Sequence, residues 1–309
     1  AIGAGFACGG FCIQFGCDWM AFLYASIAAI IGMRVRAKCN ESGLNHYMGI
    51  AISAFIATML AWASTLLPAE WTSTPWHPLL ACALFIVPGV PLINFVDDML
   101  DNYIQVGIVR AVNTLLMVSA MAFGIAFAVK LCSIGDFFPT ISMVPHHNYL
   151  EYAIAAAISA MGFSMIFNIQ RRLLWVVAIG GIIAVCTRNF VNLGPSTNNI
   201  GLDMGLVIGS FSGSVLVSLI AIKAVHWFHV PNHVLTIPSV IPMIPGVLMY
   251  RMLFGLINMN VQSIDQVTPL MKAIESGVNS GLVIMCIALG VAIPNIFGRK
   301  YIASSKNKC

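Results

Sequence analysis

Two hydrophobic segments of this chain are each broken by a Pro-Gly pair and followed by polar side chains. The segments are residues 85–101 (FIVPGVPLINFVDDMLD) and residues 237–254 (IPSVIPMIPGVLMYRMLF). The polar side chains are Asn94, Asp97 and Asp98 in the first segment and Tyr250 and Arg251 in the second. Arginine can hold a carboxylate through two parallel hydrogen bonds, and an acidic residue inside a membrane can carry a proton. Paired breaks of this kind are typical of a transporter's binding site.

The breaks themselves suit an anionic ligand. Proline removes a helical hydrogen bond, glycine lets a ligand approach the backbone, and the half-helix that follows offers amides and a positive dipole end. We therefore expect substrate to bind at these residues: Pro88, Gly89, Asn94, Pro245, Gly246, Tyr250 and Arg251. The expected proton- or ion-coupling residues are Asp97, Asp98, Asp101 and Arg110, with Asn113 close to Arg110 at the start of the next helix.

Composition indicates a membrane protein with many helical spans. The 309 residues are 59% hydrophobic and 8% charged, whereas a soluble domain carries about 25% charged residues. The long apolar blocks favour helices over the alternating strands of a β-barrel. The partners that we expect are the lipid bilayer, protons and a small amino acid or carboxylate. A homo-oligomer is compatible with this expectation. The net charge of +4 needs no nucleic-acid partner, and no cofactor or metal is expected.

Counting apolar blocks gives about ten membrane spans. The fourth covers Pro78 to about Val96 and the ninth Val234 to about Ile257, so each contains one break. Most basic residues fall on one side if both termini are cytoplasmic, as the positive-inside rule requires. Arg188 and Lys272 are exceptions to this pattern. We expect a multi-pass protein of the cell (inner) membrane, and because the sequence starts at Ala1 without Met and runs straight into apolar residues, we expect that it begins partway into a longer precursor.

The two breaks belong to a weak internal repeat. Pro88-Gly89-Val90 aligns with Pro245-Gly246-Val247, and Arg36 aligns with Arg188 in the same order along the chain. The expected repeats are residues 1–131 and 149–309, each with five spans. Because five is odd, the second repeat is inverted relative to the first, an architecture of secondary transporters with a binding site near the membrane midplane.

The sequence around both breaks resembles a known family. PGVPLINFVDDML (residues 88–100), followed by an Arg-bearing helix, resembles the central motif of the threonine/serine exporter family, and IPMIPGVLMYRMLFGL (residues 241–256) resembles the matching motif of its C-terminal module. This resemblance implies about ten membrane helices and proton-driven export of threonine and serine. The family also occurs as two polypeptides that export succinate. A basic residue, common in the family near Val96 or Asp97, is missing here, which leaves the charge of the substrate open.

Three other interpretations remain open. The chain could export small dicarboxylates such as succinate. Asp97, Asp98 and Asp101 have the DDxxD spacing that holds magnesium and diphosphate in intramembrane prenyltransferases, because magnesium favours carboxylates together with substrate phosphate. Such an enzyme needs a second acidic cluster, and the second half offers only isolated acidic residues. A channel or a non-transporting partner subunit is the third interpretation.

Overall fold

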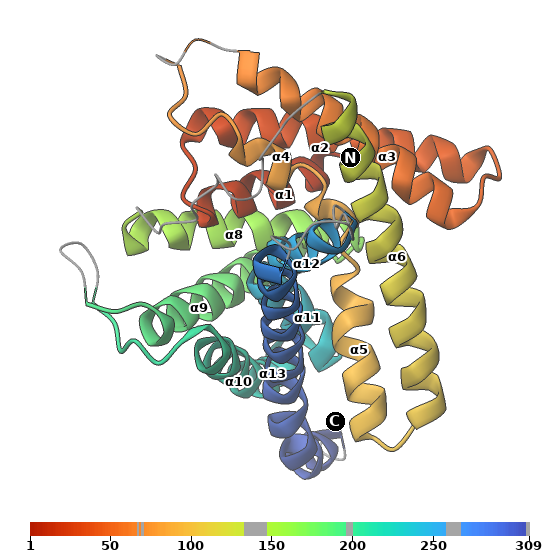
Figure 1. Cartoon of the computed structure of the whole chain (residues 1–309). Coiled ribbons are helices and arrows are strands. Elements are labelled where there is room, and N and C mark those ends of the chain that lie inside the picture. Colours follow the sequence, from red (N-terminus) through yellow and green to blue (C-terminus); the bar gives the residue numbers. More distant parts are fainter. Residues whose placement is uncertain (67, 69–70, 133–146, 196–199, 258–266, 307–309) are drawn as a thin grey trace. The chain divides into compact units, whose positions relative to one another are not determined.

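The computed structural model describes residues 1–66, 68, 71–132, 147–195, 200–257 and 267–306, and all regular structure in these ranges is helical (Figure 1). The first half contains α1 (Ile2–Gln14), α2 (Trp19–Glu41), α3 (His46–Trp62), η1 (Ala63–Leu66), α4 (His77–Ala81), η2 (Leu84–Ile86), α5 (Gly89–Leu100) and α6 (Ile104–Leu131). The second half contains α8 (Tyr149–Ile166), η3 (Arg171–Leu173), α9 (Leu174–Asn192), α10 (Leu206–Phe228), α11 (Asn232–Val240), η4 (Ile241–Met243), α12 (Gly246–Ile257) and α13 (Val267–Lys306).

The long helices confirm the prediction of an all-α polytopic membrane protein. Within the described ranges, seven helices are long and apolar enough to cross a membrane, and nine spans result if each of two bent helix pairs counts as one. The bent pairs are His77–Ile86 with Gly89–Leu100 and Asn232–Met243 with Gly246–Leu253. The short apolar helix α1, Ile2–Gln14, corresponds to the first of the ten spans expected from the sequence.

The chain divides into two compact units that exchange segments at the breaks. Unit 1 contains Ala1–Pro88, Val112–His146 and Pro245–Gly281, and unit 2 contains Gly89–Ala111, His147–Ile244 and Leu282–Cys309. Two of the five boundaries between the units therefore fall at the breaks, between Pro88 and Gly89 and between Ile244 and Pro245. The repeats expected at 1–131 and 149–309 are sequence units rather than compact units, and they stay a prediction.

Small residues bring the helices of each unit close together. In unit 1, a Cβ on Gly5 of α1 would lie 2.8 Å from Ile30 of α2, and Ser26 of α2 donates a hydrogen bond to the Gly5 carbonyl (3.0 Å). In unit 2, a Cβ on Gly181 of α9 would lie 2.7 Å from Ala160 of α8, and one on Gly213 of α10 would lie 2.6 Å from the Ala184 carbonyl of α9. Such small-residue contacts are the common way for membrane helices to associate.

The last long helix of each half packs in the same way. A Cβ on Gly124 of α6 would meet the Ala51 carbonyl of α3 and lie 3.1 Å from the Cβ of Ala54, three residues farther along α3. A Cβ on Gly290 of α13 would lie 2.9 Å from the Phe211 carbonyl of α10 and 3.0 Å from the Cβ of Ser214, again three residues farther along. The two halves thus repeat a helix contact as well as an order of elements.

Asp18, between α1 and α2, ties their connection to the loop before α4. Its carboxylate accepts hydrogen bonds from the Ala21 amide (2.7 Å), the Thr72 hydroxyl (2.9 Å) and the Ser73 amide (2.7 Å) and hydroxyl (3.2 Å). Burial alone raises the pKa of Asp18, but these hydrogen bonds favour the ionised form and bring the pKa below its ordinary value. The ionised carboxylate therefore stabilises the folded protein.

This lowered pKa predicts acid-sensitive stability. The stabilisation by Asp18 is present above the ordinary Asp pKa of about 3.9 and is lost as the pH falls through the lower, folded-state pKa. We expect Asp18→Asn to lower the unfolding temperature at neutral pH, and the gap to wild type to narrow between about pH 5 and about pH 3. Thermal unfolding in detergent micelles measures this. Equal pH slopes for the two proteins would contradict the assignment, and Ser73→Ala should reduce the slope only in part.

Candidate functional site

The two breaks have nearly the same local structure. In the first, η2 ends at Ile86, Pro88 follows, and the 12-residue helix α5 begins at Gly89; the two parts bend by 56°. In the second, η4 ends at Met243, Pro245 follows, and the 12-residue helix α12 begins at Gly246; the bend is 55°. The paired breaks predicted from Pro88-Gly89 and Pro245-Gly246 are therefore present, and each begins a new half-helix.

Each half-helix packs its first glycine against the turn that precedes the other break. A Cβ on Gly89 would lie 2.9 Å from Ile244 Cδ1 and 3.1 Å from Ile241 Cγ1, a contact within unit 2. A Cβ on Gly246 would lie 2.5 Å from Leu84 Cδ2, a contact within unit 1.

These two contacts are reciprocal in sequence position. A Cβ on Gly246 would also lie 3.5 Å from Val87 Cγ2. Leu84 and Val87 stand four residues and one residue before Pro88, and Ile241 and Ile244 stand at the same distances before Pro245. Each compact unit therefore holds the turn before one break together with the half-helix that follows the other.

The half-helix α5 in unit 2 carries the acidic candidates along one face. Asn94, Asp97 and Asp98 of α5, with Asp101 in the turn directly after it, recur at helical spacing and are half-buried. Leu92, Ile93 and Val96 are buried on the opposite side of the helix. Gly89, the first residue of this helix, is also buried. The polar stripe therefore starts one turn after the break and runs to the end of the helix.

Asp98 and Arg110 of the predicted coupling group form an ion pair. The Arg110 Nη1 lies 2.6 Å from the Asp98 Oδ2. A tight turn allows this contact: Tyr103 N donates to the Asp98 carbonyl (2.8 Å), and Asn102 adopts a φ of +67°. Asn113, which we placed beside this group, instead accepts a hydrogen bond from the Tyr47 hydroxyl (2.8 Å) in unit 1. The ion pair fixes the α5–α6 connection and neutralises Arg110.

The half-helix α12 in unit 1 carries Tyr250 and Arg251. Tyr250 is 1% exposed, and its hydroxyl contacts the Met121 sulfur of α6 at 3.5 Å. A thioether is a weak acceptor, so this contact satisfies the hydroxyl poorly. Arg251 is half-buried one residue farther along the helix. The structure thus places Pro245, Gly246, Tyr250 and Arg251 at the start of one helix, α12. Pro88 belongs to the same unit, unit 1.

Two residues that the sequence reasoning passed over also shape the breaks. Cys8 of α1 is fully buried and accepts a hydrogen bond from the Phe85 amide in η2 (3.2 Å). Pro91 is the third residue of α5 and cannot donate an amide hydrogen bond, whereas Leu248 at the matching position of α12 can. The start of α12 therefore offers one more donor to an anion than the start of α5.

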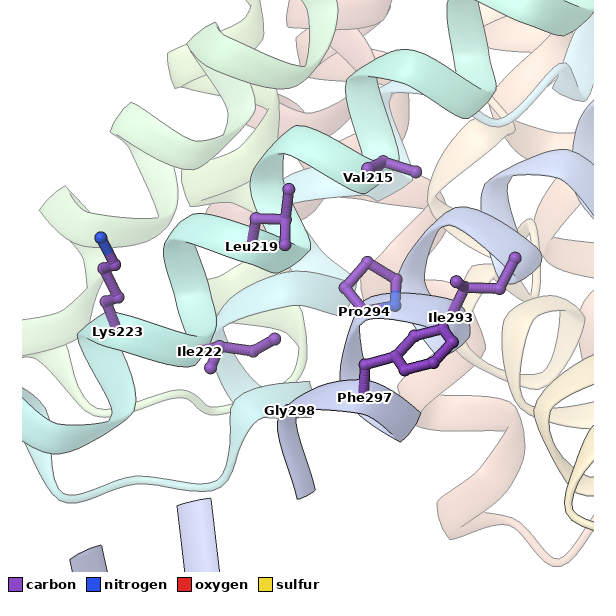
Figure 2. A pocket seen from close by; sticks show the side chains of 8 residues that line it. All are labelled: Val215, Leu219, Ile222, Lys223, Ile293, Pro294, Phe297 and Gly298. Atoms are coloured by element: carbon purple, nitrogen blue, oxygen red, sulfur yellow. The ribbon is translucent and has the colours of Figure 1, made fainter. Parts of the chain in front are cut away.

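Neither of the two cavities described in unit 2 is lined by any of these residues. The larger, about 470 Å³, runs between α10 and α13, with Val215, Leu219 and Lys223 on one side and Pro294 and Phe297 on the other (Figure 2). Its lining is almost wholly apolar.

In the described part of the chain, no group of three His, Cys, Asp or Glu residues is arranged to hold a metal. Of the three DDxxD carboxylates, Asp98 forms an ion pair with Arg110. This ion pair does not favour the prenyltransferase interpretation, in which these carboxylates hold magnesium.

The glycine contact at the second break leads to a stability prediction. Gly246→Ala forces the new methyl group against Leu84, so it should lower the free energy of unfolding by about 1–3 kcal/mol. Gly281 of α13 has open space around its Cα, so Gly281→Ala is a matched control that should stabilise the helix by about 0.5–1 kcal/mol. Denaturant unfolding in micelles measures both changes.

A double-mutant cycle tests the cause of this effect. In a Leu84→Ala background the cost of Gly246→Ala should disappear, because the contacting side chain is gone. An equal cost in both backgrounds would show that Leu84 is not responsible.

Comparisons with known proteins cover most of the chain. Residues 1–132 match the family described as "Putative threonine/serine exporter", and residues 152–297 match the one described as "Threonine/Serine exporter, ThrE". The chain is 29% identical over 127 residues to "Probable succinate transporter subunit YjjP" of Klebsiella aerogenes, covering 41% of this chain and 49% of that relative. The Escherichia coli K12 protein of the same description is 28% identical over 131 residues, covering 42% and 51%. The chain thus spans about half the length of these curated relatives. No solved structure matches significantly.

Proposed function

Because the chain belongs to the threonine/serine exporter family, we propose that it is a secondary active transporter that exports threonine, serine or a related small amino acid, coupled to protons. The observation that carries this proposal is the matched pair of broken helices, with Arg251 on one half-helix and an acidic stripe on the other. Broken helices at the membrane midplane are where secondary transporters bind substrate and coupling ions.

In this proposal the start of α12 holds the carboxylate of the substrate. The first-turn amides of a helix carry partial positive charge, and α12 has a donor at Leu248 where α5 has Pro91. Arg251 supplies the full positive charge, and Tyr250 supplies a buried hydroxyl whose acceptor in the structure is a weak one. At the first break, Pro88, Gly89 and Asn94 stay proposed substrate-binding residues. A small hydroxyl-bearing side chain and an ammonium group complete a substrate of the size of serine or threonine.

Proton coupling is assigned to the acidic stripe on α5. Asp97 and Asp98 are adjacent, and Asp101 follows them by about one helical turn; at least one of the three would take up and release a proton during each cycle. The Asp98–Arg110 ion pair would then hold the acidic stripe in one arrangement until Asp98 is protonated or the ion pair is broken. An Asp of this group could also bind the ammonium of an amino acid.

The repeat architecture supports an alternating-access cycle. We propose that residues 1–131 and 149–309 are inverted five-helix repeats and that one rocks against the other around the breaks. The equivalent contacts of Gly124 and Gly290, and the reciprocal contacts of Gly89 and Gly246, support this repeat. We place the protein in the cell (inner) membrane with both termini cytoplasmic, and a homo-oligomer is compatible with this arrangement.

Export of a dicarboxylate is the second candidate function. Its support is the likeness of the first half to proteins described as probable succinate transporter subunits. Succinate has two carboxylates and no ammonium group, so it would use Arg251 and a helix start without needing an acidic partner. Substrate competition therefore separates the two candidates.

Counterflow in proteoliposomes tests the site. We expect saturable exchange of radiolabelled serine or threonine, and Arg251→Gln should raise the KM by about tenfold or more, because a charge-assisted hydrogen bond to the carboxylate is lost. Arg172→Gln, which removes an exposed arginine that contacts Gln170, should leave the KM unchanged. Exchange of succinate but not of the amino acids would favour the dicarboxylate exporter. Exchange that is insensitive to Arg251→Gln would move the carboxylate away from α12.

Proton coupling is tested separately with Asp97→Asn, Asp98→Asn and Asp101→Asn. The variant that removes the coupling carboxylate should retain counterflow, which needs no net proton movement, but lose accumulation driven by a pH gradient. Arg110→Gln removes the ion-pair partner of Asp98, so it should change gradient-driven accumulation only if Asp98 is the coupling carboxylate. Gradient-driven transport that survives in all three variants would show that no carboxylate of this stripe carries the proton.

A further inference from the structure

Arg188 on α9 is a cation without a described anionic partner. Its Nε and Nη2 donate hydrogen bonds to the Asn189 side-chain oxygen at 3.2 and 3.1 Å, and Asn189 is a neutral amide. No carboxylate of the described residues forms an ion pair with Arg188. The residue is half-buried within the apolar span Arg171–Asn192. It also lies at the end of that span opposite to Arg171 and Arg172, so it departs from the charge pattern that orients the other helices.

Tyr152 on α8 is buried beside this arginine. Its side chain is 1% exposed, and its hydroxyl donates no hydrogen bond in the described structure, although it lies near the backbone amide of His147. Arg188 lies within electrostatic range of this hydroxyl. Buried hydroxyl groups in folded proteins are hydrogen-bonded as a rule, so a buried hydroxyl whose proton has no acceptor calls for a ligand or water.

The packing of α8 on α9 explains why these two side chains meet. Gly181 of α9 lies against Ala156 and Ala160 of α8. Tyr152 is one helical turn before Ala156, and Arg188 is two turns after Gly181 on the same face of its helix. α8 and α9 are joined by η3 and a short connection, so they run antiparallel. The start of α8 therefore lies beside the end of α9.

The third helix of this unit closes one side of the pair. A Cβ on Gly209 of α10 would lie 2.6 Å from the Arg188 carbonyl, so α10 touches α9 at the backbone of Arg188. At the start of α8, His147 contacts the Glu151 carboxylate at 2.7 Å, and the His147 ring lies edge-on to Tyr152 with centroids 6.0 Å apart. Glu151 is therefore engaged at the start of α8, where it also completes the capping box of that helix.

We propose that Arg188 and Tyr152 form a carboxylate-binding site in unit 2, separate from Arg251 in unit 1. The guanidinium can donate two parallel hydrogen bonds to a carboxylate, and the phenol can donate a third. Asn189 holds the guanidinium in place. The ligand class is a small carboxylate, and the site lies at the end of α9 remote from Arg171 and Arg172. Binding there does not depend on the transport function proposed above.

The test measures succinate binding to the purified full chain in nanodiscs by isothermal titration calorimetry at constant ionic strength. The experiment uses an Arg251→Gln background, so that the carboxylate partner proposed for α12 is removed, and uncharged succinamide serves as the negative ligand. Succinate should still bind in this background. Arg188→Gln should raise the Kd by about tenfold or more, Tyr152→Phe should raise it about threefold to tenfold, and Arg172→Gln should not change it.

Several outcomes would overturn the proposal. Loss of all succinate binding in the Arg251→Gln background would leave no second site. Unchanged affinity in Arg188→Gln or Tyr152→Phe would show that the pair is structural only. If Arg188→Gln does not fold, the near-isosteric Tyr152→Phe decides the question alone. Counterflow that fails in every variant while this binding persists would contradict the transporter proposal and leave the carboxylate site standing.

Discussion

A backbone amide or carbonyl freed inside a bilayer has no water to bind, and this cost constrains how a membrane helix can be broken. Here each break is an ordered turn. The Val87 amide bonds back to Leu84 (3.1 Å) and the Ile244 amide to Ile241 (2.9 Å). The Cys8 sulfur accepts a hydrogen bond from the Phe85 amide. Protein groups thus replace the missing helical hydrogen bonds. The half-helices that follow are then rigid enough to present polar residues at defined positions.

The exchange of segments follows from the same constraint. A glycine at the start of a half-helix leaves a gap that apolar side chains must fill, and here the turn before the opposite break fills it: Ile241 and Ile244 at Gly89, and Leu84 at Gly246. Each compact unit is consequently completed by the other half of the sequence. In the proposed transport cycle, the breaks that would bind substrate are also two of the points where the chain passes between the units.

Local effects could be predicted from the sequence, and long-range ones could not. Proline and glycine act on their own turn, so Pro88-Gly89 and Pro245-Gly246 sufficed to predict two breaks. Asp98 and Arg110 flank one short connection, and their closeness followed from it. The packing of Gly89 on Ile241, the thiol contact of Cys8 and the meeting of Tyr152 with Arg188 depend on the register between helices, which no single segment encodes. Pro91 was visible in the sequence, but its effect emerged only when α5 and α12 were compared.

The most direct test of the account is paired-cysteine cross-linking in a chain whose native cysteines are replaced. The pairs are Gly89→Cys with Ile241→Cys and Gly246→Cys with Leu84→Cys, and Gly281→Cys with Leu84→Cys is the control. If each half-helix packs on the opposite break, both reciprocal pairs should form disulfides rapidly in membranes, since bridged residues need Cα atoms within about 7 Å, and the control should not. Absence of cross-linking in both reciprocal pairs, under conditions that preserve transport, would contradict the exchange of segments on which the proposed site depends.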